Sequence, residues 1–228
     1  MIVNELHGWQ VSIPEAKHLQ NKLRERISLV SGVKLSEIHR VAAADVSFNR
    51  FGKYLYGAVV VLDFPSLEIQ QVFLKKFVAK FPYVPGYLSF REAPVVIEIF
   101  REIEPVPDIL LCDGQGIAHP RGIGLASHVG LFLEIPTIGC AKSLLVGEFS
   151  EPGMEKGSKS PLMYQERIVG TVLRTRRNVK PIFVSPGHHI SIRDAAKFAL
   201  QCSPRYRIPE PIRIAHQQVN DFRRVNEN

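Results

Sequence analysis

Three apolar segments follow one another early in the chain, at residues 38–48, 55–64 and 69–78. Their β-branched and aromatic residues are typical of strands. The linkers at 49–53 and 65–68 are too short for a crossover connection, so the strands are expected to pair as antiparallel hairpins. A three-stranded meander at this point restricts the number of folds that the rest of the chain can complete.

Helices and strands alternate in the remainder of the sequence. Residues 12–15 have the pattern of a capping box and predict a basic helix that ends near Val30. A second helix is predicted from Ser89 to about residue 104, and residues 108–114 indicate a buried parallel strand that ends in a glycine turn. The other predicted elements are helices at about 124–134, 192–202 and from 211 onwards, strands at 137–141, 167–174 and 182–185, and a surface loop at 150–161.

The order βββ-α-β-α-β predicts an α/β protein with an RNase H-like layout. This is a mixed central sheet with three antiparallel strands followed by α/β units and with helices on both faces. The fourth strand would return beside the first, so that Asp45 and Asp113 meet at one edge of the sheet. Because no repeat or linker is visible, residues 1–228 are expected to form a single domain.

Positive charge predominates, with 29 Lys and Arg against 22 Asp and Glu, a formal net charge of +7. Such an excess favours an anionic partner, and nucleic acid is the default polyanion. Charge alone does not decide the matter, because many basic proteins bind no nucleic acid.

The sequence also bears on the cellular compartment. No apolar run reaches membrane-spanning length, and the first ten residues lack the pattern of a signal peptide. The three cysteines form no CxxC pair, which argues against a disulfide framework or a structural zinc site. We therefore expect a cytoplasmic protein that contacts no membrane.

Two aspartates interrupt apolar segments where a charge is costly. Asp45 lies within the run 41–46, and Asp113 follows the run 109–112. Carboxylates are rarely buried unless they are paired or bind a metal. Either one alone could be a strand residue that faces solvent. Together they favour a site for Mg²⁺ or Mn²⁺, cations that prefer oxygen ligands and assist phosphodiester hydrolysis.

Other candidate residues have an ordinary structural interpretation. Residues 89–92 fit a capping box, which accounts for Glu92 without catalysis. His216 lies beside the apolar face of the last helix, where a lone histidine is usually structural. Three further signals are weak in isolation, namely His119, Lys142 and the pair His188-His189. The histidine pair follows Pro-Gly and indicates a loop, with a metal-binding role left open.

Tyr83 lies between Pro82 and Pro85 on a loop that the prolines stiffen. Proteins that distort a duplex insert such side chains between base steps. A turn whose tyrosine packs back on the fold is the commoner arrangement in general.

Six segments of the chain resemble the endonuclease V family. They are AADVS at 43–47, PYVPG at 82–86, SFRE at 89–92, DGQGIAHP at 113–120, GIGLASH at 122–128 and GCAKS at 139–143. The resemblance extends over about residues 10–224, the motif at 113–120 is highly specific, and no motif position departs from the family.

The resemblance implies a repair nuclease that requires Mg²⁺, with Mn²⁺ as a substitute. Such an enzyme recognises deoxyinosine, a deaminated adenine base, in DNA and nicks the strand at the second phosphodiester 3′ to it. By matching position, Asp45 and Asp113 would hold the metal, and Glu92 would complete the carboxylates. His216 would lie near the attacking water or the metal, and Lys142 near the reacting phosphate.

The resemblance also implies a surface that recognises the base. Tyr83 would be a wedge, carried by Pro82 and Pro85. The residues that would approach the extruded base are Gly86, Leu88, Gly114 and His119. Glycine suits this role because a backbone without Cβ lets a planar ring come close.

Two alternatives stay open at this point. Some members of the family resemble RNA nucleases, so an inosine-directed RNA endonuclease is the second hypothesis, and the 2′-hydroxyl contacts that separate the two are not readable from sequence. The third is a non-catalytic nucleic-acid-binding module, which an Asn or Ala at Asp45 or Asp113 would have favoured. We expect a monomer whose partner is DNA containing deoxyinosine.

Overall fold

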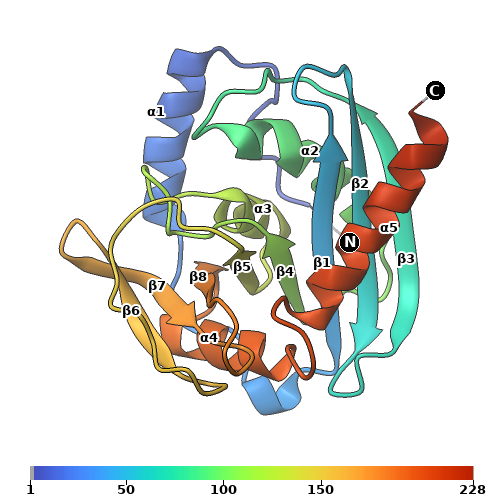
Figure 1. Ribbon diagram of the computed structural model, residues 1–228. Helices are drawn as coiled ribbons and strands as arrows, with labels where there is room; N and C mark the ends of the chain where they lie inside the picture. The colour runs from blue at the N-terminus through green and yellow to red at the C-terminus, as the bar shows by residue number, and fades with distance from the viewer. Residues whose placement is uncertain (1–2, 228) are drawn as a thin grey trace.

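The opening strands form the predicted antiparallel meander. The computed structural model describes residues 3–227, in which β1 (Arg40–Phe48), β2 (Tyr54–Asp63) and β3 (Ile69–Val78) pair in chain order (Figure 1). β3 lies at the edge of the sheet and alternates exposed with partly buried residues, whereas β2 is buried along most of its length. β1 therefore lies inside the sheet, with a free side for another strand.

β4 (Ile109–Asp113) occupies that side and runs parallel to β1, which confirms the RNase H-like layout. β5 (Thr137–Ala141) runs parallel to β4 on its far side. The register pairs the residue before Asp45 with the residue before Asp113. The two aspartates are therefore neighbours at the carboxyl ends of adjacent parallel strands.

The sheet continues beyond β5 with antiparallel strands. β8 (Ile182–His188) pairs with β5, β7 (Arg167–Leu173) with β8, and β6 (Lys159–Tyr164) with β7. The strand order is β3-β2-β1-β4-β5-β8-β7-β6. The parallel α/β units thus lie in the middle, between two antiparallel parts.

Two predictions in this last part are wrong at their ends. The strand predicted to stop before Pro186, leaving His188 in a loop, continues as β8 to His188. Proline donates no N–H, but the Pro186 carbonyl accepts the N–H of Ile117 at 2.9 Å. The predicted loop at 150–161 includes the start of β6 at Lys159, where polar edge-strand residues gave no strand signal.

Helices cover both faces of the sheet (Figure 1). α2 (Leu88–Phe100) and α3 (Leu125–Leu133) pack on one face, and α4 (Ile192–Gln201) and α5 (Glu210–Asn226) pack on the other. Residues 41–44 of β1 alternate between the two hydrophobic cores. This alternation is what a strand buried on both sides requires.

α1 (Ile13–Leu23) begins with the predicted capping box at Ser12 and Glu15. The prediction that it ends near Val30 is wrong, because a 3-10 turn, η1 (Arg24–Arg26), follows and the chain then becomes extended. Apolar residues on both sides of this turn pack into one small core cluster, which bends the chain there.

α2 begins differently from the prediction. Its N-cap is Tyr87, which makes no side-chain capping bond. The hydroxyl of Ser89 lies 3.0 Å from Nδ1 of buried His128, so it is engaged in the core instead. The predicted capping box is therefore wrong, and Glu92 has no capping role. The helix ends at Phe100, before the predicted residue 104.

The remaining elements are short. A second 3-10 turn, η2 (Leu35–Glu37), leads into β1. Within residues 3–227, no helix combines the length and the apolar character that a membrane span requires.

Candidate active site at the carboxyl ends of the strands

Asp45 lies on β1 beside α5. Its Oδ2 atom is 2.7 Å from Nδ1 of His216, and its Oδ1 atom accepts the N–H of Val46 at 2.8 Å. Its side chain is 11% exposed. Burial, and next the negative charge of Asp113, raise the pKa of Asp45 above its ordinary value, although His216 opposes the shift. The apolar stripe of α5 packs against β1 and β2, which holds His216 at the end of the strand.

Asp113 ends β4 and lies next to a cation. Lys142, directly after β5, donates from Nζ to Oδ2 of Asp113 at 2.6 Å. The lysine side chain is 41% exposed, so its ammonium group lies at the mouth of the site. The ends of three adjacent strands therefore place Asp45, Asp113 and Lys142 together, as expected for the carboxyl edge of parallel strands.

Glu92 on α2 is the third carboxylate. Burial, and then the charges of Asp45 and Asp113, raise the pKa of Glu92 to about 8. The carboxyl group is therefore mostly protonated at neutral pH when no cation is nearby. Because the charges of Asp45 and Asp113 disfavour the ionised form of Glu92, a positive charge would stabilise this site.

The donor set fits a divalent metal ion. One ligand atom from each of Asp45, Asp113 and His216 lies within 4.8 Å of the others. Glu92 stands outside this group but is coupled to it by charge. Carboxylate oxygens are the ligands that Mg²⁺ and Mn²⁺ prefer, and a bound cation would offset the repulsion. We call Asp45, Glu92, Asp113 and His216 the acidic cluster.

A cavity of about 360 Å³ opens beside the acidic cluster. Its size falls in the range of small-ligand sites, about 300–1,000 Å³. Every residue predicted to contact the base or to form the wedge lines this cavity, except Pro82. The lining residues are Tyr83, Pro85, Gly86, Leu88, Ser89, Glu92, Asp113, Gly114, Gln115, His119, Gly124, Leu125 and Leu145. We call it the base cavity.

Two glycines of its wall have backbone conformations that suit glycine. Gly86 has φ of +80°, and its carbonyl accepts hydrogen bonds from Gln20 and Arg121. A Cβ at Gly86 would come within 2.8 Å of the guanidinium of Arg121. Gly114 has φ of +155°, and a Cβ there would find only Leu125, at 3.7 Å. Side chains at either position would strain the wall or enter the cavity.

His119 is a buried histidine in the same wall. Its Nδ1 atom accepts the N–H of Arg121 at 3.2 Å, which leaves the proton of the neutral ring on Nε2. Burial, and then the charge of Arg121, lower the pKa of His119 to about 4. The ring is therefore neutral at pH 7 and can offer a single N–H donor.

Tyr83 is half-buried at the cavity mouth, between the exposed Pro82 and Pro85. The guanidinium carbon of Arg50 lies 4.9 Å from the centroid of its ring, and the ring of Phe48 is 6.1 Å away. The ring thus packs partly on the fold and partly faces solvent. Its role as a wedge stays a prediction.

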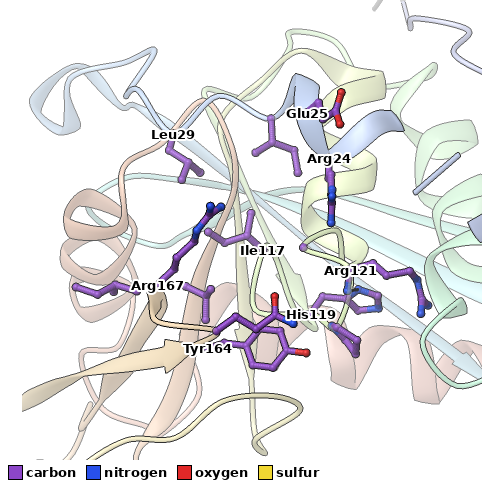
Figure 2. A pocket seen from close by; sticks show the side chains of 14 residues that line it. Arg24, Glu25, Leu29, Ile117, His119, Arg121, Tyr164 and Arg167 are labelled. Atoms are coloured by element: carbon purple, nitrogen blue, oxygen red, sulfur yellow. Dashed lines mark hydrogen bonds between the residues drawn. The ribbon is translucent and has the colours of Figure 1, made fainter. Parts of the chain in front are cut away.

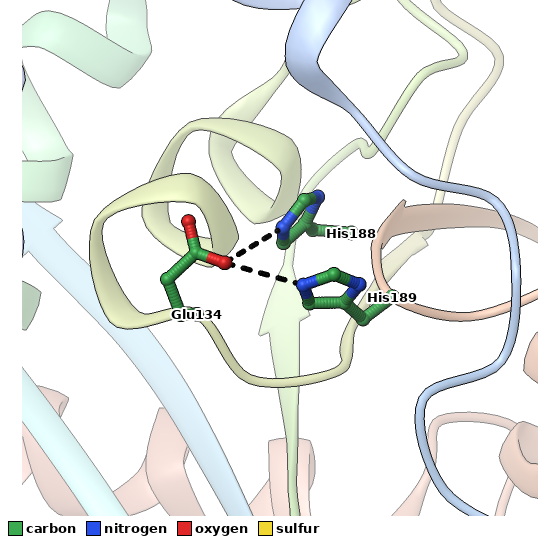
Figure 3. A group of neighbouring side chains, drawn as sticks. All are labelled: Glu134, His188 and His189. Carbon is green, nitrogen blue, oxygen red and sulfur yellow. Dashed lines mark hydrogen bonds and ion pairs between the residues drawn. The ribbon is translucent and has the colours of Figure 1, made fainter.

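A second group of histidines and a carboxylate lies at the C-terminal end of α3. Nε2 of His188 and Nε2 of His189 lie 3.5 Å and 3.2 Å from Oε2 of Glu134, the C-cap residue of α3 (Figure 3). The backbone N–H of Ser28 donates to Nδ1 of His188 at 3.2 Å. Because Nδ1 is an acceptor, Nε2 of the neutral ring carries the proton and points at the carboxylate. We call these three residues the histidine cluster.

Sequence reasoning missed several residues that support the site. Asn220 lies 3.3 Å from Nε2 of His216 and is held by the hydroxyl of Ser47 at 2.9 Å. Its spacing of four residues from His216 is a helical signal that could have found it. Gln20 on α1 is fully buried and bonds both Gly86 and Arg121. No local signal indicates that partnership.

Comparison with known proteins agrees with this geometry. The family pattern described as Endonuclease V matches residues 21–217. A Nostoc punctiforme protein named Endonuclease V is 47% identical over 210 residues, which is 92% of this chain and 94% of the relative. The crystal structure of endonuclease V from Streptomyces avermitilis superposes with a TM-score of 0.92 at 37% identity, covering 97% of each chain.

A further solved structure contains nucleic acid. Ciona intestinalis endonuclease V, in complex with a 24mer DNA containing an inosine followed by a ribo-adenosine, superposes with a TM-score of 0.82. It is 30% identical to this chain and covers 93% of it and 98% of the Ciona chain.

Proposed function

The chain belongs to the endonuclease V family, and on this premise we propose that it recognises deoxyinosine in DNA and nicks that strand at the second phosphodiester bond on the 3′ side. The observation that carries the proposal is that the acidic cluster and the base cavity are in contact. The acidic cluster, which fits a divalent cation, shares Glu92 and Asp113 with the base cavity. An extruded base and a reacting phosphate of one strand can therefore bind side by side.

We propose that Asp45 and Asp113 bind the metal, Mg²⁺ with Mn²⁺ as a substitute, and that Glu92 completes the carboxylates. A divalent cation held there supplies Lewis acidity and offsets the charge that develops on the phosphate. Because the pKa of Glu92 is about 8 in the protein alone, its ionisation accompanies metal binding. Metal affinity should therefore rise with pH up to about this value.

His216 is proposed to orient and deprotonate the attacking water. Its Nδ1–H donates to Oδ2 of Asp45, so Nε2 is left with a lone pair. Asn220 lies near that nitrogen and limits how the ring can turn. Lys142, half-exposed at the mouth, is proposed to neutralise the scissile phosphate, since its ammonium group is already held by Asp113.

The base cavity is proposed to take the extruded hypoxanthine. Gly86, Leu88 and Gly114 would contact its ring, and the neutral His119 would offer a hydrogen-bond donor. Tyr83, carried by Pro82 and Pro85, would fill the gap that the base leaves in the duplex.

An inosine-directed RNA endonuclease is the second candidate function. The Ciona relative was solved with DNA in which a ribonucleotide follows the inosine, so a 2′-hydroxyl at that position is compatible with binding in that protein. A non-catalytic binding module is not favoured, because Asp45, Glu92, Asp113 and His216 are all present at one site.

We further propose that the protein acts as a monomeric single domain in the cytoplasm. The acidic cluster and the base cavity are both formed by one chain, so the site needs no partner subunit. All three cysteines are free and buried, which suits a reducing compartment.

The decisive test compares matched oligonucleotides that carry one inosine, in DNA and in RNA, with Mg²⁺ and with chelator. We expect Mg²⁺-dependent nicking of the DNA at the second phosphodiester 3′ to inosine, and none in the matched adenine control. Faster cutting of the RNA would favour the second candidate. Nicking that persists in chelator would contradict a metal-dependent mechanism.

A further inference from the structure

A second cavity, of about 660 Å³, adjoins the base cavity and shares His119 with it. Its walls come from three segments that are distant in sequence: η1 with residues 27 and 29, the loop 117–122, and the turn between β6 and β7 (Figure 2). No residue of the acidic cluster lines it. The base cavity therefore touches this second cavity through His119 and the acidic cluster through Glu92 and Asp113.

The lining of this cavity is cationic and carries one aromatic ring. Three arginines, Arg24, Arg121 and Arg167, stand against one acid, Glu25. Figure 2 shows Arg24 and Arg167 on different walls of the cavity, with the ring of Tyr164 at another side and apart from both guanidinium groups. Within residues 3–227, neither of these two guanidinium groups has a hydrogen-bond or ion-pair partner. They are free to bind an anion.

Arg121 has a different role. Its guanidinium donates to Gln20 and to the carbonyl of Gly86, and it stacks on the ring of Tyr87 at 4.1 Å. It therefore fixes the wall that separates the two cavities, while Arg24 and Arg167 face the open space.

The turn that presents Tyr164 and Arg167 is unusual. Its two central residues, Gln165 and Glu166, have φ of 48° and 60°, although neither is glycine. A two-residue hairpin turn of type I′ requires positive φ at both central residues, which glycine or asparagine usually supplies. Tyr164 and Arg167 are directly paired across the hairpin, so their side chains project from the same face. An aromatic ring and a free guanidinium that line one cavity can together bind a nucleotide, the first by stacking and the second by a phosphate contact.

We propose that this cavity binds the nucleotide on the 5′ side of the inosine in the strand that is cut, an inference that rests on the proposed function. The polarity follows from the order of the sites. The scissile bond lies 3′ to the inosine, so the 3′ flank runs from the base cavity towards Asp113 and Lys142. The 5′ flank would leave the base cavity on another side, and the arginine-lined cavity adjoins the base cavity there through their shared wall residue His119.

The test measures kcat/KM with Mg²⁺ on two single-stranded DNAs. One has a ten-nucleotide flank 5′ to the inosine, and the other has inosine as its 5′-terminal nucleotide with a free hydroxyl. For the flanked substrate, Arg167→Ala should lower kcat/KM about tenfold, which is the effect of one charge-assisted phosphate contact. It should also reduce by about 0.7 the slope of the logarithm of the binding constant against the logarithm of the salt concentration. On the substrate without the flank, wild type and variant should be equal.

Matched variants separate this role from folding. Arg167→Lys should recover part of the loss, Tyr164→Phe should act like wild type, and Tyr164→Ala should lose activity only when the flank is present. Arg177→Ala is the charge control, because it removes an exposed arginine that pairs with Glu155 outside this cavity. It should leave kcat/KM unchanged on both substrates.

An equal loss of kcat/KM for Arg167→Ala on both substrates would overturn the inference. If wild type fails to cut either DNA, the proposed function itself is wrong. If it cuts both equally well, only the inference about the flank is wrong.

Discussion

The acidic cluster and the histidine cluster look alike by distance and differ in charge. In each, three residues offer ligand atoms that lie within 4.8 Å of one another: Asp45, Asp113 and His216 in the first, and Glu134, His188 and His189 in the second. In the acidic cluster, burial and mutual repulsion raise the pKa of both Asp45 and Glu92. In the histidine cluster, the single carboxylate of Glu134 faces two imidazole rings. The N–H of Ser28 donates to Nδ1 of His188, so the proton of that neutral ring is on Nε2.

The difference shows that proximity of ligand atoms does not by itself identify a metal site. In the histidine cluster, a single carboxylate lies 3.2 Å and 3.5 Å from two imidazole nitrogens and has no second carboxylate to repel it. In the acidic cluster, burial and like charge raise the pKa of Asp45 and Glu92 even though His216 and Lys142 lie against the two aspartates, and a bound cation would offset that repulsion. Unbalanced charge beside a cavity is therefore the better indicator of function.

The largest effect should come from Asp113→Asn. If Asp113 binds the metal as proposed, its loss removes several kcal/mol of transition-state stabilisation, so nicking should fall more than about 10³-fold. The same should hold for Asp45→Asn. Single-turnover nicking with Mg²⁺ measures it, and circular dichroism checks the fold. Glu134→Gln, which removes a carboxylate from the histidine cluster, is the matched control and should cut at the wild-type rate. Near-normal nicking by Asp113→Asn would end the metal hypothesis.

His216→Ala should lower kcat about 10²–10⁴-fold, the usual contribution of a general base, with little change in binding to inosine-containing DNA. His189→Ala, in the histidine cluster, is the matched control and should leave kcat unchanged. Kinetics and equilibrium binding together separate the two effects. A strongly lowered melting temperature of His216→Ala, with normal specific activity of the folded fraction, would show that this histidine is only structural.

Tyr83→Ala should weaken nicking of an inosine-containing duplex about ten- to a hundredfold, since stacking of an aromatic ring on a base contributes about 1–3 kcal/mol. A single-stranded substrate has no partner strand to separate, so the loss of nicking rate on it should be much smaller. The metal dependence should not change, because Tyr83 lies outside the acidic cluster. Rates are compared on both substrates at one salt concentration, with Tyr83→Phe as the control. Equal losses on both substrates would exclude the wedge.

Glu92→Gln should stabilise the metal-free protein at alkaline pH. Because the pKa of Glu92 is raised to about 8, the folded state holds a proton that the unfolded chain releases between its ordinary pKa of 4.5 and this value. Wild-type stability therefore decreases over that range as pH rises. Each unit of the shift corresponds to about 1.4 kcal/mol, or roughly 3–5 °C in a protein of this size.

The measurement is thermal unfolding in chelator at pH 5 and at pH 8.5. Glu92→Gln should melt higher than wild type at the alkaline pH and close to it at pH 5. An unchanged difference at the two pH values would mean that the carboxyl group ionises normally and that the acidic cluster is not under electrostatic strain.

The smallest effect is expected in the histidine cluster. Glu134 is 44% exposed there, and partly exposed ion pairs contribute about 0–1 kcal/mol, so Glu134→Gln should lower the melting temperature by about 4 °C or less. Added Zn²⁺ should not change this difference. In an Asp113→Asn background, a Zn²⁺-dependent rise in melting temperature that Glu134→Gln abolishes would show that the histidine cluster also binds metal.

Local patterns were enough to predict much of the fold. The strands β1 to β5, the apolar stripe of α5 and the capping box of α1 follow from residue periodicity and short linkers, which act over a few residues. The meeting of Asp45 with Asp113 followed from strand order alone, because parallel neighbours end at the same edge. The sequence motifs also identified the family.

Only the tertiary structure decided how the side chains are used. Ser89 matches a capping box locally, yet its hydroxyl is taken by His128 from another helix. Pro186 predicts a turn, yet its carbonyl finds a donor in a distant loop and the strand continues. Gln20 reaches the base cavity from α1, and Ser28 sets the proton of His188. Such choices depend on which groups folding buries together, because a buried polar atom takes whichever partner the surrounding chain supplies, and sequence neighbours do not specify that partner.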